Sequence, residues 1–519
     1  MTRAIIIGGG IAGLATAALL ARDGHEVTVL EQRDVVGGRA GSWEQDGFRF
    51  DTGPSWYLMP EVFDHFFRLL GTTADEQLSL TQLDPGYRVF GEGHPEPLDI
   101  AASREANIAL FESVEPGAGA KLARYLDKAK EITRLAIDHF LYSTFDRLGP
   151  VFSRRVVARG GRLTRLLTES LHSLAARSVT ERRLRQILGY PAVFLGSAPR
   201  LAPSMYSLMS HLDLEEGVFY PQGGFTIVIE RIAALAAAEG AEVRTGASVQ
   251  RILVENGRAV GVEVVGADGA SERLDAELVV SAADLHHTET RLLENAADRT
   301  FPEAYWAKRT AGPSALLLLL GVRGELPNLE HHTLLFSEDW DENFGAIFDS
   351  PSRIPATPSL YVCKPSGVDA SVAPEGHENL FVLVPLPADP TIGAGGVDGA
   401  GDAEVEALAD RVIAQIADWT GTPDLADRIV VRRTIAPRDF QTDLNAWKGT
   451  ALGPAHTLSQ SAFFRAGNKS KKVDNLLYVG GSTIPGIGLP MCLISAELIV
   501  KRLRGDTSAG PMPEPLERA

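Results

Sequence analysis

The first forty residues contain the glycine pattern that restricts the fold of this chain most strongly. Gly8, Gly10 and Gly13 have the spacing G-x-G-x-x-G between a short apolar run and a stretch of small and apolar residues. The run before the glycines fits a buried parallel strand, and the stretch after them, 11–22, fits a helix packed on a sheet. A second strand is predicted at 26–30. The order strand, glycine turn, helix, strand predicts an α/β fold that begins with a βαβ unit.

Each position of this motif has a physical task in a Rossmann-type domain. Gly8 permits the tight turn, Gly10 lets the backbone approach a pyrophosphate, and Gly13 lets the helix pack closely on the strand. The free N–H groups and the dipole of the helix start favour a diphosphate. Glu31 ends the second strand, and its carboxylate can accept both ribose hydroxyls of an adenosine. The same carboxylate would repel a 2′-phosphate, which disfavours NADP.

Two further segments favour FAD over NAD. Residues 31–40 read E-x-R-x-x-x-G-G-R-A and 48–55 read F-R-F-D-T-G-P-S, so backbone groups and the Arg39 guanidinium can reach a second part of the cofactor. Near the C-terminus a predicted strand at 475–479 is followed by a glycine turn and by an apolar helix at 491–504. The positive end of that helix can face the N1–C2=O edge of a flavin. An NAD dehydrogenase needs no such element, so FAD is the expected cofactor.

The same segments carry a resemblance to a known family. The patterns E-x-R-x-x-x-G-G-R-A and F-D-x-G-P resemble the amine oxidase and phytoene desaturase superfamily of flavoproteins. G-G-S-T-x-P-G-x-G-x-P-M at 480–491 resembles the bacterial-type phytoene desaturases, and the resemblance extends to about Gly505. Together with the glycine motif, it implies FAD contacts at Gly8, Gly10, Ile11, Ala12, Gly13, Glu31, Gln32, Arg33, Gly38, Arg39, Ala40, Gly53, Pro54, Ser55, Val249, Gly480, Gly481, Gly488, Leu489, Pro490 and Met491.

The cofactor domain is expected to be assembled from discontinuous segments, with the rest of the chain on the substrate side. Apolar runs at 314–322 and 380–386 predict buried strands of a mixed β-sheet that floors a substrate tunnel. The expected organisation is an FAD-binding domain at 1–106, 213–300 and 441–505, a helical substrate or membrane-facing region at 107–212, a β-sheet substrate domain at 301–440, and a flexible tail at 506–519.

Charge and hydropathy restrict the partners of the protein. The formal net charge of −17 disfavours nucleic acid, because phosphate binding needs a basic surface. The longest apolar run, 315–322, is far shorter than the about 20 residues that span a bilayer. We therefore expect a cytoplasmic protein whose membrane association, if present, is peripheral.

Cysteine and histidine spacing gives no metal-binding pattern. Cys363 and Cys492 lie far apart and form no C-x-x-C motif, so neither a disulfide framework nor a zinc site is expected. His286 is followed by His287, and His331 by His332, but neighbouring side chains point in different directions and no further ligand lies at helical spacing. The sequence therefore predicts no metal site.

An arginine-rich stretch stands out in this acidic chain. It lies at 147–200 and is interleaved with leucine, valine and phenylalanine. One interpretation is attachment to anionic lipid, at about 1 kcal/mol per basic residue near the surface. The other is a solvated face paired with acidic neighbours, and the sequence leaves both open. The arginines are Arg154, Arg155, Arg159, Arg162, Arg165, Arg177, Arg182, Arg183 and Arg185.

The resemblance implies a function that neither composition nor spacing provides. It implies desaturation of a long polyene, a carotenoid precursor, by hydride transfer from an allylic CH2–CH2 to flavin, with a quinone or oxygen as the final acceptor. Such a hydrocarbon does not travel through water and would be collected from a membrane. A catalytic base is not specified. Asp51, His456 and Asp439 are candidates, and each can instead cap or orient a loop.

Rival activities remain open on the same scaffold. Proteins with this resemblance include carotenoid isomerases, ketolases and saturases. An amine oxidase would need an aromatic cage at the flavin, whereas the C-terminal motif offers Ile484, Ile487, Leu489 and Met491, which favour a hydrocarbon. A non-catalytic escort protein could lose the flavin-facing turn, but residues 480–491 retain it.

Overall fold

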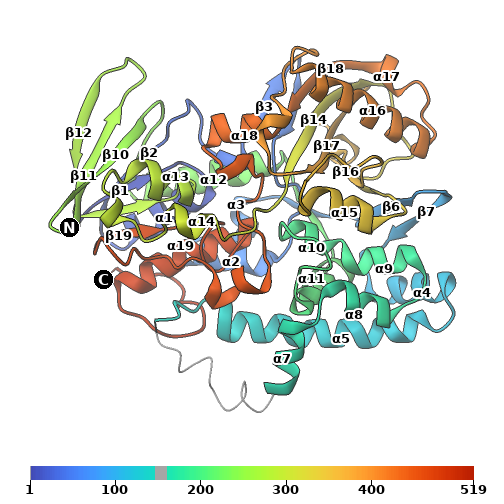
Figure 1. Ribbon diagram of the computed structural model, residues 1–519, viewed down its shortest axis with the longest axis horizontal. Helices are drawn as coiled ribbons and strands as arrows, with labels where there is room; N and C mark the ends of the chain where they lie inside the picture. Colours follow the sequence, from blue (N-terminus) through green and yellow to red (C-terminus); the bar gives the residue numbers. More distant parts are fainter. Residues whose placement is uncertain (1, 147–159, 519) are drawn as a thin grey trace.

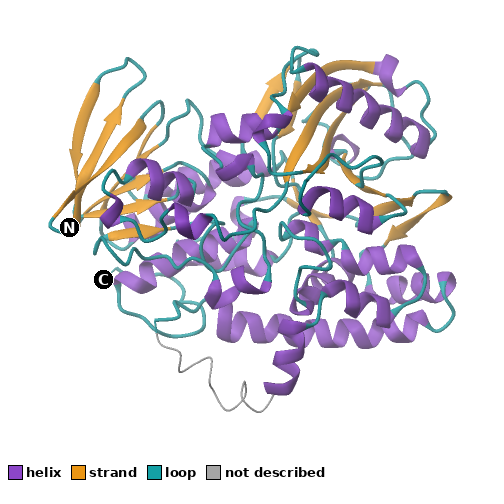
Figure 2. Ribbon diagram, in the orientation of Figure 1, coloured by secondary structure: helices purple, strands orange, loops and turns teal. Residues whose placement is uncertain are grey.

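Two large sheets and a layer of helices dominate the described part of the molecule, together with a three-stranded sheet and two short two-stranded ones. The computed structural model describes residues 2–146 and 160–518. A five-stranded sheet lies beside the two chain ends, a seven-stranded sheet lies across the molecule from it, and helices pack below the larger sheet (Figures 1 and 2). The prediction of an α/β fold with a helical region is confirmed by this arrangement.

The five-stranded sheet is parallel and draws its strands from separated parts of the chain. Its order is β19 (Leu476–Tyr478), β13 (Leu278–Ser281), β1 (Arg3–Ile7), β2 (Glu26–Leu30) and β9 (Glu242–Arg244). Register places Ile5 of β1 between Thr28 and Val279. A Rossmann-type sheet with strands from both ends of the chain is therefore present, as the sequence predicts.

Alternation along β1 defines two layers on this sheet. Ala4 and Ile6 pack into the cluster that contains helices α1 (Ile11–Arg22), α12 (Phe225–Ala238) and α19 (Leu489–Leu503). Ile5 and Ile7 face the opposite cluster, under the antiparallel meander of β10 (Ser248–Glu255), β11 (Arg258–Val265) and β12 (Ser271–Asp275). Because successive strand residues point to opposite faces, a continuous apolar strand must be covered on both sides.

The seven-stranded sheet is mixed and carries the longest strands. Its order is β18 (Ile429–Ile435), β14 (Ser314–Arg323), β17 (His377–Leu386), β16 (Leu360–Cys363), β15 (His332–Phe336), β6 (Tyr87–Gly91) and β7 (His94–Ile100). The two predicted apolar strands pair antiparallel, with Leu317 opposite Leu383. Leu316 and Leu318 pack under α16 (Ala403–Thr420), while Ala315 and Leu317 face the interior.

Helices form the layer below the larger sheet. They include α4 (Arg104–Val114), α5 (Ala118–Ala136), α7 (Gly160–Thr168), α8 (Leu171–Ser178), α9 (Arg182–Gly189), α10 (Pro191–Phe194) and α11 (Met209–His211). The remaining helices are α2 (Pro60–Leu69), α3 (Ala74–Gln77), α13 (Leu285–His287), α14 (Glu303–Trp306), α15 (Trp340–Phe348), α17 (Leu425–Arg428) and α18 (Pro437–Leu444). Two two-stranded sheets complete the described strands. One pairs β3 (Ser42–Gln45) with β4 (Phe48–Asp51), and the other pairs β5 (Leu80–Gln82) with β8 (Phe219–Pro221). Within 2–146 and 160–518, no helix combines the length and apolar character that a membrane span needs.

The C-terminal segment is not the loose tail that its proline-rich composition suggests. Met512 and Leu516 are buried in the core that α1, α2 and α19 form. The Leu516 N–H donates to the carbonyl of Leu69 at 2.9 Å. The fully buried ammonium of Lys501 donates to the carbonyl of Gly510 at 2.6 Å. The prediction of a flexible tail at 506–519 is wrong for the described residues 506–518, because two apolar side chains and a buried cation hold them down.

A histidine bridges α2, α19 and this segment. His65 contacts the Glu497 carboxylate through Nε2 at 2.9 Å and the Glu514 carboxylate through Nδ1. Burial lowers the pKa of His65, but the two carboxylates outweigh burial and hold the pKa above its usual value. Because the pKa of His65 is higher in the folded protein than in the unfolded chain, its protonation stabilises the fold. This contribution is fully present below the unfolded pKa of about 6.5 and is lost as the pH rises through the folded pKa.

We therefore expect His65→Gln to lower the melting temperature more at pH 6 than at pH 9. Exposed His172, replaced in the same way, is the matched control and should change the melting temperature little at either pH. Thermal unfolding of the parent and both variants across this pH range measures the effect. A loss of melting temperature in His65→Gln that grows with pH would contradict this stabilising role of protonated His65.

Candidate cofactor and substrate site

One continuous cavity joins the first glycine turn to the C-terminal glycine turn. Its volume is about 650 Å³, within the usual range for a ligand site, and its wall includes Gly10, Glu31, Leu489 and Met491. These residues lie more than 450 positions apart in the sequence, and the parallel sheet brings them together by placing β1 and β19 on either side of β13. The prediction that both turns face one space is confirmed.

The first turn is shaped for a ligand that approaches its backbone. A side chain at Gly13 would place its Cβ 2.0 Å from the Gly8 carbonyl oxygen, so helix α1 packs against the turn only with glycine there. At Gly10, by contrast, the nearest atom to such a Cβ is the Gly37 carbonyl oxygen at 3.8 Å. Gly10 thus leaves open space toward the cavity, next to the N-terminus of α1. The residues fit a diphosphate at this position.

The Glu31 carboxylate is built into the same turn. One oxygen accepts the Gly9 N–H at 2.7 Å and the other accepts the Arg33 N–H at 2.9 Å. The side chain is buried and lines the cavity. A carboxylate oxygen can accept more than one hydrogen bond, so Glu31 is oriented by the loop and still suited to ribose hydroxyls.

Arg39 supplies a partly unpaired cation to the wall. Its Nε and one terminal nitrogen are buried and make no hydrogen bond among the described residues. The nearest acid is Asp284, whose carboxylate lies 3.7 Å away and also accepts the His286 N–H at the start of α13. Buried donors without partners cost free energy, so this guanidinium fits an anionic or carbonyl-bearing ligand in the cavity.

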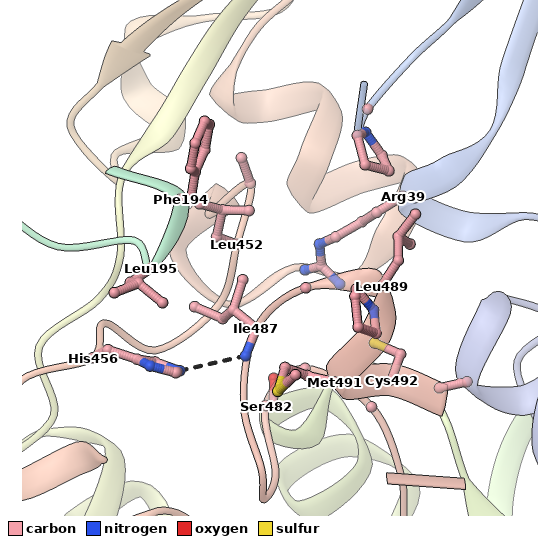
Figure 3. A pocket seen from close by; sticks show the side chains of 18 of the residues that line it. Arg39, Phe194, Leu195, Leu452, His456, Ser482, Ile487, Leu489, Met491 and Cys492 are labelled. Carbon is pink, nitrogen blue, oxygen red and sulfur yellow. Dashed lines mark hydrogen bonds between the residues drawn. The ribbon is translucent and has the colours of Figure 1, made fainter. Parts of the chain in front are cut away.

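The C-terminal turn is held rigidly before α19 begins. Arg465 is buried and donates to the carbonyls of Thr483 and Gly481, and burial lowers its pKa to about 10. Asn468 donates to the carbonyl of Ile484 at 3.1 Å. Gly488, at φ 118°, adopts a conformation that suits glycine, and Leu489 then starts the helix. These bonds hold the turn in place, and Figure 3 shows Leu489 and Met491, at the start of α19, beside the pocket.

His456 is a structural support of this turn. Its Nε2 accepts the Ile487 N–H at 3.3 Å (Figure 3). Its Nδ1 therefore carries the proton and donates to the Tyr206 hydroxyl at 2.8 Å. A Cβ at Gly486 would lie 2.4 Å from the imidazole, which shows how closely the turn packs on it. Burial, together with the nearby Arg465 cation, holds the pKa of His456 well below its usual value. A neutral ring with both nitrogens engaged is not a free base.

The other two candidate bases lie away from the cavity wall. Asp51 accepts the N–H groups of Phe225 and Thr226 at the start of α12, and burial raises its pKa to about 6. Asp439 accepts the N–H groups of Ala436 and Gly395 at 2.7 Å each. Both carboxylates therefore cap helices or loops, which is the structural alternative that the sequence left open.

The remaining predicted cofactor residues gather along the wall, except for two. Gly13 lies inside the βα packing, and Arg33 uses its backbone to hold Glu31 and Gly246. The wall contains Gly8, Gly10, Ile11, Ala12, Glu31, Gln32, Gly38, Arg39, Ala40, Gly53, Pro54, Ser55, Val249, Gly480, Gly481, Gly488, Leu489, Pro490 and Met491.

An apolar arm of the cavity runs between the larger sheet and the helical layer. Its floor is Ala315 and Leu317 of β14 with Leu383 of β17, and Phe194 and Leu195 of the helical layer lie on its other side. The prediction that this sheet floors a tunnel agrees with that geometry. Sequence reasoning missed the helical-layer residues, since their only signal was ordinary hydrophobicity.

The arm reaches the surface beside aromatic side chains. Phe145 and Phe463 line it with their rings 6.4 Å apart, and Phe463 remains 43% exposed. Phe464, next to it, is 51% exposed. Exposed neighbouring phenylalanines at a cavity mouth are unusual on a water-facing surface. We call Phe463 and Phe464 the mouth pair.

The described part of the arginine-rich stretch is paired with acids. Arg177 and Arg165 contact Glu169 at 2.8 and 3.4 Å, and Arg183 contacts Glu181 at 3.0 Å. Arg182 pairs with Glu338, and Arg185 donates to the carbonyl of Thr180. Arg154, Arg155, Arg159 and the side chain of Arg162 lie outside the described residues. Four of these five arginines are thus ion-paired, as the second interpretation expects, whereas Arg185 bonds to a backbone carbonyl.

Comparisons with known proteins agree with this geometry. Residues 11–503 match the family described as flavin containing amine oxidoreductase. The chain is 40% identical, over 96% of its length and 98% of the relative, to a carotenoid 3,4-desaturase of Haloarcula japonica. It is 34% identical to a zeta-carotene-forming phytoene desaturase of Myxococcus xanthus, over 96% and 93%. Among solved structures, an oxidoreductase of Methanosarcina mazei and a putrescine oxidase align with TM-scores of 0.62 each. The Methanosarcina mazei oxidoreductase is 18% identical, and its alignment covers 96% of this chain and 100% of its own length. The putrescine oxidase is 15% identical, and its alignment covers 97% of this chain and 99% of its own length.

Proposed function

Since the chain belongs to the family of flavin containing amine oxidoreductases, we propose that it is an FAD-dependent carotenoid desaturase. The observation that carries the proposal is the single cavity whose one end is a dinucleotide cradle and whose other end is an apolar arm. A long hydrocarbon without polar groups can be held in such an arm only by shape and by burial of apolar surface. An electron acceptor outside the chain, a quinone or oxygen, completes the turnover.

The proposed reaction removes two hydrogens from a saturated carbon pair of a polyene. Bound FAD supplies the redox chemistry by accepting a hydride from an allylic carbon. The neighbouring carbon releases a proton, and a new double bond joins the two carbons. Over the full turnover the external acceptor takes up both hydrogens, so that a quinone becomes a hydroquinone or oxygen becomes hydrogen peroxide. The residues of the protein position the polyene and exclude water. Leu489 and Ile487 line the cavity at the turn, and the positive end of the α19 dipole stabilises negative charge on the bound cofactor.

The lining of the turn favours a hydrocarbon over an amine. Ile484, Ile487, Leu489 and Met491 present apolar surface, and none of them offers an aromatic ring or an acceptor to an ammonium group. The likeness to a putrescine oxidase, at 15% identity, shows the fold alone.

A reconstitution assay tests the proposal. The FAD-loaded protein is mixed with vesicles that contain phytoene or a partly desaturated acyclic carotenoid, with a quinone or oxygen supplied. We expect products that lack two hydrogens per step and absorb at longer wavelength, measured by mass spectrometry after chromatography. An unchanged mass with a new isomer, an added oxygen, or two added hydrogens would assign an isomerase, a ketolase or a saturase instead. No product from any substrate would overturn the proposal.

We further propose that the protein docks on membranes with the mouth pair, so that substrate enters the arm without crossing water. Burial of two half-exposed phenylalanines is worth about 1 kcal/mol each. Replacing Phe463 and Phe464 with serine should therefore weaken binding to vesicles about tenfold or more in a flotation assay. Val430→Ser removes a similarly exposed apolar side chain, 48% exposed on β18, and is the matched control. Equal vesicle binding by both variants would contradict this docking.

A further inference from the structure

A buried group of two histidines and one cysteine lies beside the cavity wall. The imidazoles of His331 and His332 and the thiol of Cys363 offer ligand atoms that all lie within 4.8 Å of one another. Strand pairing supplies the third member, because His332 on β15 lies opposite Cys363 on β16. The sequence spacing did not reveal this group, since the register of a sheet is a tertiary property.

The histidine nitrogens of this group lack partners. Both ring nitrogens of His331 and the Nε2 of His332 are buried and make no hydrogen bond among the described residues. His331 is 5% exposed and His332 is fully buried. A buried polar atom without a partner costs about 1 to 3 kcal/mol, so three such atoms in one place call for a ligand.

The surroundings orient His332 as metal ligands are oriented. Its Nδ1 lies 2.7 Å from the Tyr361 hydroxyl, and that hydroxyl lies 2.7 Å from Ser55 Oγ. When the Nδ1–H donates to Tyr361, and Tyr361 donates to Ser55, the Nε2 keeps a free lone pair. The Trp56 ring stacks on this imidazole at 4.3 Å and fixes its plane. A hydrogen bond from the second ring nitrogen is the usual support of a ligating histidine.

We propose that His331, His332 and Cys363 form a three-coordinate site for a soft monovalent cation, Cu⁺. One thiolate and two neutral imidazoles are ligands that suit a soft d10 ion. Binding replaces the thiol proton, which leaves to solvent, so Cu⁺ and the thiolate together carry no net charge. Zn²⁺ would leave one more positive charge than the thiolate compensates in a buried place, where the Lys364 ammonium and the Asp369 carboxylate both act on His331.

The site closes by side-chain rotations. Three ligand atoms about 2.0 to 2.3 Å from a shared ion lie about 3.5 to 3.7 Å apart in a trigonal arrangement. The present separations are within 4.8 Å, so the group needs to contract by at most about 1.3 Å. Because Cu⁺ displaces the thiol proton, affinity for Cu⁺ should rise with pH.

Anaerobic titration of the FAD-loaded protein with Cu⁺, against a chromogenic Cu⁺ chelator, tests the site. We expect one equivalent to bind, and Cys363→Ser to weaken binding by about 100-fold or more. Cys492→Ser is the matched control, because it removes the other cysteine of the chain, and it should bind Cu⁺ as the parent does.

A second ligand variant keeps the test independent of how Cys363→Ser folds. His331→Gln removes the ligand that directly precedes β15, whereas Cys363 lies on β16. This variant should also fail to bind one Cu⁺ tightly. FAD absorbance reports whether each variant is folded. Titration with Zn²⁺ separates the two metals. Parent-like Cu⁺ affinity in either ligand variant, tighter binding of Zn²⁺ than of Cu⁺, or no tight equivalent in the parent would overturn the proposal.

Discussion

Replacing Gly10 with valine is expected to weaken FAD binding about 100-fold or more while the folded apoprotein keeps nearly the stability of the parent. Gly10 has φ −74° and ψ 173°, which any residue adopts without strain. A Cβ there meets no atom closer than 3.8 Å, so the protein itself has room for the side chain. That room is the space that a diphosphate needs. Overlap with the cofactor should cost about 3 kcal/mol or more, which corresponds to about 100-fold in affinity.

Two other glycines provide the comparison for this variant. Gly467→Val places a side chain at a position with no atom within 4 Å and away from the cavity wall, and should leave FAD binding unchanged. Gly13→Val drives a Cβ to 2.0 Å from the Gly8 carbonyl oxygen and should destabilise the fold itself. Flavin absorbance after purification and thermal unfolding of the apoproteins separate the three cases. Retention of FAD by Gly10→Val would show that the first turn does not hold the cofactor.

Replacing His456 with alanine is expected to lower the turnover number about 100-fold without loss of FAD. The change removes the acceptor of the Ile487 N–H and opens space against Gly486, so the turn before α19 can shift. A displacement of about 1 Å at a reacting centre can cost about 100-fold in rate. The diphosphate cradle at Gly10 is untouched, so FAD should remain bound, with a changed visible absorbance spectrum.

The His456 series also distinguishes support from proton transfer. Because the pKa of His456 is held well below its usual value, the ring is neutral throughout the working pH range, and its removal should not change the shape of the pH profile. His456→Gln offers an amide oxygen to Ile487 and should restore part of the rate. Tyr206→Phe keeps the Ile487 bond and should lose little. Disappearance of an ionisation from the pH profile in His456→Ala would instead identify His456 as a base.

The residues of the cofactor cradle could be predicted because their signals are local. A glycine that must bring its backbone close to a ligand, followed by a helix start, is recognisable within six residues, and Gly8, Gly10 and Glu31 all line the cavity. The roles of Asp51 and Asp439 could not be read in this way. A carboxylate that caps a helix and one that takes a proton look alike in sequence, and only the N–H groups around them decide.

The sequence by itself determined the elements of this protein, since the periods of its apolar residues and its turn glycines are short-range properties. It determined β1, α1 and β2, the strand–turn–helix near residue 480, and the apolar strands β14 and β17. Only the tertiary structure decided what these elements enclose. Pairing of β19 with β13 brings two turns that are distant in sequence to one cavity, and the register between β15 and β16 places Cys363 opposite His332. Burial of Met512 and Leu516 anchors residues 506–518 to the core, although the composition of this segment suggests disorder. Such contacts depend on which surfaces are left to be covered, and no local pattern records that.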